Sequence, residues 1–191
     1  MTDRLPPVPP ENWDRQQREA ADEVIRGPRG ALVAPFVPLL RSPELMTHAQ
    51  RMGEYLRYRS AVGLRPSELA ILVTARHWSQ QVEWAIHAPI ALRAGIPQET
   101  VDAIAEGRAP QSMSPDDALV YEFCHELHQN KGVADTTWSA VVTRFGERGA
   151  VDLLAIAGYY TFLSMVMNGA RTAAPPTDAV PLKSLTGMDE T

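Results

Sequence analysis

Residues 75–95, ARHWSQQVEWAIHAPIALRAG, form the stretch that decides the fold. Gln80, Glu83 and His87 stand three and four residues apart in it, a spacing that places their side chains on one face of an α-helix. Trp84 and Ile86 lie among them, so we expect this helix to be largely buried. A buried helix face that carries an amide, a carboxylate and an imidazole indicates either a chemical site or a structural hydrogen-bond network.

The composition is that of an ordinary globular protein, with 191 residues, 45% hydrophobic residues and a net charge of -5. This length fits one domain with a full core. The basic residues are dispersed among acids, which argues against a nucleic-acid partner. Because no stretch reads as a signal peptide or a membrane span, we expect a cytoplasmic protein without a membrane partner.

Helix signals recur along the chain and no segment alternates apolar and polar residues, so the sequence predicts an all-α fold. We expect an N-terminal extension with one helix at 1–37, a helical domain at 38–172 and a Pro-rich tail at 173–191. Prolines make 30–43 an irregular connector and the tail extended or poorly ordered. The expected helices cover 11–26, 42–62, 65–78, 80–94, 97–105 and 147–168, and two more begin at Ser114 and Asp135.

Glu68 adds a fourth position to the polar pattern. It lies 12 residues before Gln80, 15 before Glu83 and 19 before His87. This spacing resembles the alkyl hydroperoxidase D and carboxymuconolactone decarboxylase superfamily, whose redox members carry Glu, then Cys-x-x-Cys, then His. Gln80 and Glu83 occupy the two cysteine positions, so only Glu68 and His87 match as they stand.

The resemblance spans roughly residues 38–168. It continues in His87-x-x-x-Ala91-x-x-x-Gly95, and the segment from Gly158 to Asn168 is similar to the final helix of the decarboxylase-like branch. It implies an alkyl hydroperoxidase D-like helical bundle that assembles as a homo-trimer or hexamer. The apolar final helix is either central in the core or shared with another subunit.

Thiol peroxidase chemistry is excluded at this site, because neither Gln80 nor Glu83 can form a thiolate. Cys124 is the only cysteine, and its apolar neighbours predict that it is buried. The decarboxylase-like branch implies instead a lyase of aromatic compound degradation. Such an enzyme releases carbon dioxide from a small carboxylated lactone and then delivers a proton to the dienolate.

The resemblance makes His87 the expected proton donor and Glu68 the group that fixes its tautomer. Glu83 and Gln80 are expected to orient the substrate or a water. The substrate is an anionic small molecule, for which Arg76, one turn before Gln80, is the candidate cation; an exposed helix arginine is the alternative interpretation. No metal or cofactor is expected.

A second polar cluster, formed by Glu122, His125, Glu126 and His128, contains a His-x-x-His spacing that can hold a metal. The complete His-Glu-x-x-His signature is missing and no third ligand is evident, so a solvated helix face is favoured.

Two alternatives to the lyase remain open. One is an oxidoreductase that uses an external reductant or cofactor in place of a local dithiol. The other is a non-catalytic oligomeric protein in which Glu68, Glu83 and His87 form a buried structural network. A closed site in which Glu83 and His87 satisfy only each other would favour structure, and an open pocket would favour chemistry.

Overall fold

The computed structural model describes residues 2–183, and the regular structure within them is entirely helical, which confirms the all-α prediction. Residues 184–191 of the predicted tail lie outside the described residues. The elements are η1 (Pro10–Asn12), α1 (Arg15–Arg26), α2 (Phe36–Leu39), α3 (Pro43–Tyr58), α4 (Leu64–His77), α5 (Gln81–Arg93), α6 (Gln98–Ala105), α7 (Pro115–Asn130) and α8 (Asp135–Ala170).

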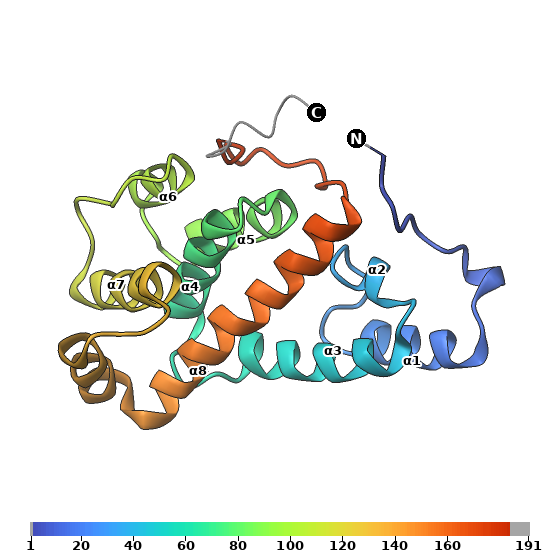
Figure 1. The fold of residues 1–191 in the computed structure, drawn as a ribbon, viewed down its shortest axis with the longest axis horizontal. Coiled ribbons are helices and arrows are strands. Elements are labelled where there is room, and N and C mark those ends of the chain that lie inside the picture. Colours follow the sequence, from blue (N-terminus) through green and yellow to red (C-terminus); the bar gives the residue numbers. More distant parts are fainter. Residues whose placement is uncertain (1, 184–191) are drawn as a thin grey trace.

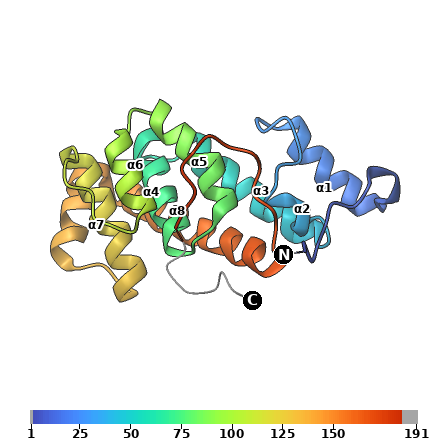
Figure 2. The ribbon, with the colours of Figure 1, turned by 90° about the horizontal axis from the view of Figure 1, so that it is seen from above.

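Helix α4 is the central element of the fold. It packs against α5, α7 and α8, and the long helix α8 runs diagonally across the molecule from the α7 end toward α2 (Figures 1 and 2). The residues from Ser67 to Arg76 of α4 are all buried, because neighbours cover this helix on every side. The helix pair α4–α5 therefore brings the polar residues of both helices into the core.

Gly146 divides α8 into the two helices that the sequence predicts there. Its φ of 74° and ψ of 169° interrupt the helix, and glycine adopts such a positive φ without steric cost. The expectation that no segment approaches a membrane span needs correction, because α8 has the length and apolarity of one. Core helices of soluble proteins share these properties, and 56% of its most apolar window is buried within the fold.

The N-terminal extension packs on α3 and contributes to the core. Asp14 and Gln17 form a capping box at the start of α1, and the buried face of this helix carries Ala20, Ala21 and Val24. The connector after it is less irregular than predicted, because it contains α2. Pro35 and Pro38 both fit this short helix, because the residues of the first helical turn need no backbone N–H.

The C-terminal segment 172–183 is extended and lies along α5. Pro89, inside α5, has no N–H to donate to the carbonyl of Ala85, and the Thr177 hydroxyl donates to that oxygen at 3.3 Å. The Trp84 indole donates to the carbonyl of Val180 at 2.8 Å, and Leu182 is buried. The described part of the tail is therefore a structural strap that completes the hydrogen bonding of α5.

Candidate active site

His87 lies between two buried carboxylates. Its Nδ1 is 2.7 Å from Oε2 of Glu68 on α4, and its Nε2 is 3.5 Å from Oε2 of Glu83, one turn earlier on α5. The three side chains are at most 3% exposed. The structure thus brings together the three residues that the spacing assigns to one pocket.

The two contacts of the imidazole differ in kind. The short contact to Glu68 is a hydrogen bond in which Nδ1–H donates to the carboxylate, and this fixes Nε2 as the ring nitrogen that faces Glu83. The separation at Nε2 is longer than a good hydrogen bond. Burial raises the pKa of Glu83 to about 7, although the charge of His87 opposes that rise. Glu83 can therefore gain or lose a proton near neutral pH.

Two tyrosines of α8 cover this acid–base group. The rings of Tyr160 and His87 meet edge to face, 5.1 Å between centroids. Burial, together with the charges of Glu83 and Glu68, raises the pKa of Tyr160 well above 10, so its phenol stays neutral. The Tyr159 hydroxyl and Oε1 of Glu83 are buried without a hydrogen-bond partner among the described residues. The site thus holds polar atoms that a ligand could satisfy.

A cavity of about 320 Å³ gives access to Glu83, His87 and both tyrosines. Its walls come from the loop between α1 and α2, the end of α3, α5 and α8. Arg29 and Arg57 line it together with apolar residues such as Ile86. Neither arginine forms an ion pair with a described carboxylate, and both charges act to lower the pKa of Glu83. The cavity thus has an acid–base end and two cations.

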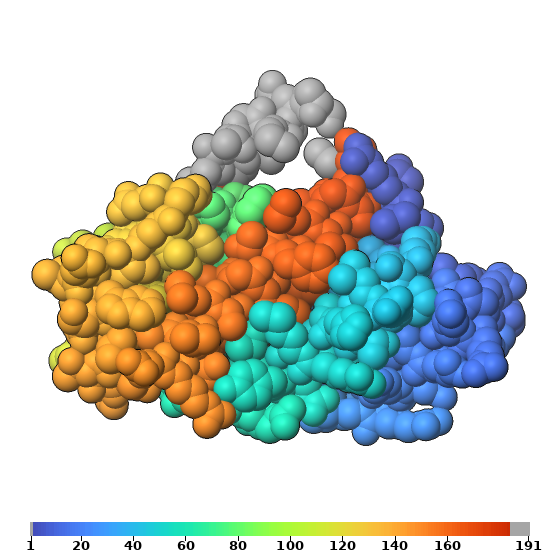
Figure 3. Space-filling view, turned by 60° about the horizontal axis from the view of Figure 1, so that its bottom comes forward, coloured from blue at the N-terminus to red at the C-terminus, as the bar shows by residue number. Residues whose placement is uncertain are grey.

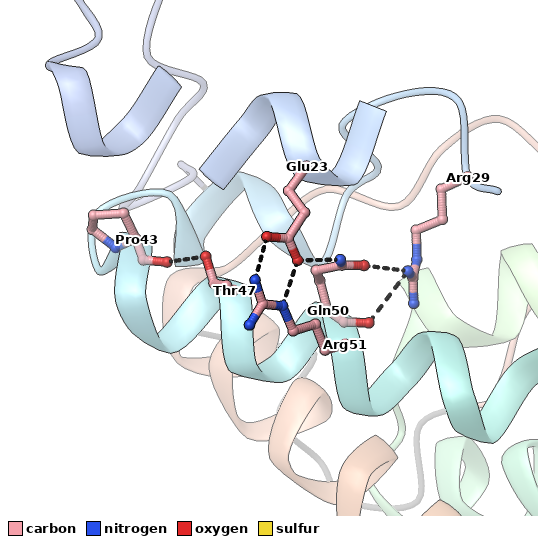
Figure 4. Close-up of polar contacts among 6 residues, drawn as sticks. All are labelled: Glu23, Arg29, Pro43, Thr47, Gln50 and Arg51. Atoms are coloured by element: carbon pink, nitrogen blue, oxygen red, sulfur yellow. Dashed lines mark hydrogen bonds and ion pairs between the residues drawn. The ribbon is translucent and has the colours of Figure 1, made fainter. Parts of the chain in front are cut away.

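Arg29, in the N-terminal extension, is held in place by Gln50 of α3, which is in turn bonded to α1. Its Nη1 donates to Oε1 and the backbone oxygen of Gln50, at 3.0 and 3.5 Å (Figure 4). The Gln50 amide nitrogen donates to Glu23 of α1 at 2.7 Å, and Glu23 accepts two further bonds from Arg51. Helix α1 therefore contributes to the orientation of a cavity-lining cation.

Two predicted site residues lie elsewhere. Gln80 is the N-cap of α5 and not part of its helical face, because its backbone is extended and its Oε1 accepts from the N–H of Val82. Its amide nitrogen donates to Asn168 of α8 at 2.8 Å, so it joins two helices. Arg76 does not line the cavity at His87 and lines a different one. These positions correct the expectation that both residues lie in one pocket with His87.

The cavity at His87 is lined neither by Cys124 nor by the second polar cluster, which consists of Glu122, His125, Glu126 and His128. Cys124 is fully buried, and burial raises the pKa of its thiol to about 12. Glu126 accepts bonds from the backbone of Ala134 and the hydroxyl of Thr137, which ties α7 to the start of α8. Within residues 2–183, no group of three or more His, Cys, Asp or Glu side chains is placed to hold a metal ion.

Comparison of the chain with models of known protein families gives no match, and neither does a search among curated proteins. The resemblance to the carboxymuconolactone decarboxylase superfamily therefore stays a prediction from residue spacing. The chemistry of the site has to be inferred from its own geometry.

Proposed function

We propose that the protein is an acid–base enzyme, of the decarboxylase-like lyase type, that acts on a small carboxylated molecule. The observation that carries this proposal is the position of His87. One carboxylate holds it, and it faces a second at the wall of a cavity with two arginines that form no ion pair within residues 2–183. An open cavity at His87 also favours chemistry over the purely structural network.

The chemistry requires a carboxylate anchor and a proton donor. Arg29 and Arg57 supply positive charge for the substrate carboxylates. When the bond to the departing carboxylate breaks, its electron pair stays on the remaining carbon skeleton as an enolate. The imidazolium of His87 then gives the proton on Nε2 to the carbon atom. The neutral ring that remains keeps its other proton on Nδ1, where it is bonded to Glu68. Glu83 can restore the proton because its pKa is near neutral.

Binding of small carboxylates and carboxylated lactones tests the proposal directly. We expect calorimetry to detect binding of at least one member of such a panel, with release of carbon dioxide on incubation. Arg57→Gln should weaken that binding by about tenfold, because it removes one charge-assisted contact. Arg59→Gln is the matched control, since Arg59 is exposed, pairs with Glu54 and does not line the cavity. Binding that is equal in all three proteins would contradict the proposal.

We further propose that the protein is a homo-oligomer in the cytoplasm, a trimer or a dimer of trimers. Along one side of the molecule, α8 is exposed between α3 and the α7 end (Figure 3). Val151 and Met165 of α8 are each more than half exposed. Apolar residues on an uncovered helix face favour association with another chain. Light scattering should give a mass of three or six times 21.0 kDa, and a stable monomer at micromolar concentration would refute this.

A further inference from the structure

A second cavity, of about 140 Å³, lies where α4, α6 and α7 meet, at one end of the molecule (Figure 1). It shares no lining residue with the cavity at His87. Among the described residues, no carboxylate lines it. The nitrogen-bearing side chains that do are Arg76, His77, Arg108, His125, His128 and Gln129.

Arg76 is a buried cation without a counter-ion among the described residues. It is 6% exposed, and its guanidinium donates to the carbonyls of Ala105 and Lys183, at 2.9 and 2.7 Å, and to the hydroxyl of Ser79. Within residues 2–183 its Nε has no hydrogen-bond partner, and burial lowers the pKa of the guanidinium. A buried charge that is compensated only by neutral dipoles is costly. The surroundings of Arg76 would therefore be stabilised by a negative charge.

His128 lines this cavity, and one of its ring nitrogens has no hydrogen-bond partner among the described residues. The Thr74 hydroxyl donates its single proton to the carbonyl of Ala70, so its oxygen must accept from Nε2–H of His128, 2.9 Å away. In the neutral ring, Nδ1 therefore carries no proton, and it becomes a donor when the ring is charged. The ring of His77 stacks on that of His128, 4.6 Å between centroids, so the two imidazoles share one environment.

The ionisable groups around these rings are mostly basic. They are Arg76 and His77 on α4, Arg108 after α6, His125 and His128 on α7, and Lys131 at the end of α7. Glu106 is the acid beside them, and it pairs with Arg108 and Lys183. Burial, and then repulsion from His77, Lys131 and His125, lowers the pKa of His128 to about 4. A bound anion would relieve that repulsion.

We propose that this second cavity is a binding site for a small oxyanion of the phosphate, sulfate or carboxylate type. Its size suits one such group. Arg76 and Arg108 provide permanent positive charge, and His77 and His128 provide further donors as the pH falls. The site is independent of the chemistry proposed at His87.

Histidine resonances measured by NMR across a pH titration test this site in the full chain. With millimolar phosphate, compared with chloride at equal ionic strength, the pKa values of His77 and His128 should rise by about one unit, because an adjacent anion favours the charged ring. Sulfate and acetate arms identify which oxyanion is preferred. The His48 ring, exposed on α3, serves as the internal reference. Equal titration curves in chloride and in all three oxyanions would overturn the proposal.

Two exposed lining residues provide variants that should keep the fold. Arg108→Gln and His77→Gln are each expected to weaken phosphate binding by about threefold to tenfold in calorimetry. Arg93→Gln, an exposed arginine of α5 that does not line the cavity, is the matched control and should bind as the unaltered chain does. Unchanged affinity in both lining variants would place any bound anion elsewhere and refute the assignment.

Discussion

Replacing His87 by Gln is expected to reduce turnover by on the order of a hundredfold or more, the usual contribution of a positioned acid or base. Glutamine keeps a polar group between the carboxylates of Glu68 and Glu83 but cannot transfer a proton at neutral pH. The fold should be retained, because the helices around the site are held by an extensive apolar core. The measurement is kcat on the best substrate of the carboxylate panel, with circular dichroism and light scattering to verify the fold and assembly.

Cys124→Ser is the control for this experiment. Its thiol is buried in another part of the core and does not line the cavity, so turnover should not change. Loss of activity with Cys124→Ser and not with His87→Gln would reverse the assignment. If His87→Gln lowers the melting temperature while turnover stays the same, the buried group is a structural network.

Glu83→Gln is expected to stabilise the protein above neutral pH. The pKa of Glu83 is raised by burial from 4.5 to about 7, so between these values the folded state binds a proton that the unfolded state has lost. The free energy of unfolding therefore falls as the pH rises through this window and levels off above it. Glutamine has no charge to bury, so the variant should gain about 3 kcal/mol over the unaltered chain at pH 8.

Denaturant unfolding across the range from about pH 4.5 to pH 8 measures this difference. The gain of Glu83→Gln should be close to zero at the acid end and largest at the alkaline end. The exposed Glu44 on α3 provides the control, since Glu44→Gln should leave the pH profile unchanged. A constant difference between Glu83→Gln and the unaltered chain at all pH values would show that Glu83 is ionised throughout.

The sequence was sufficient to predict the helices and the core of the site because both depend on local signals. Prolines, capping residues and glycines mark helix ends, and the spacing of Glu83 and His87 follows from helical geometry. Gln80 shows the limit of this reasoning. It lies one residue before the start of α5, so it does not share the helical spacing of Glu83 and His87. Its side chain instead accepts a hydrogen bond from the backbone at the helix start.

The cations of the cavity could not be predicted, because long-range packing places them. Arg29 follows a turn after α1, and Arg57 sits in the last turn of α3, where a basic residue also has an ordinary role near the helix C-terminus. Neither has a local signal that relates it to His87. Arg76 is the opposite case. Its position one helical turn before Gln80 suggested that it belongs to the site at His87, but the packing of α4 against α6 places it at another cavity.

The strap formed by residues 172–183 has a consequence for synthesis of the chain. Ala85 of α5 accepts a hydrogen bond from a residue 92 positions later, and Trp84 and Gln81 donate to residues 96 and 101 positions later. Helix α5 therefore leaves the ribosome long before those partners exist. The carbonyl freed by Pro89 must meanwhile be satisfied by water, and the indole of Trp84 stays uncovered. The helix that carries Glu83 and His87 is thus translated near the middle of the chain but is among the latest elements to reach its final environment.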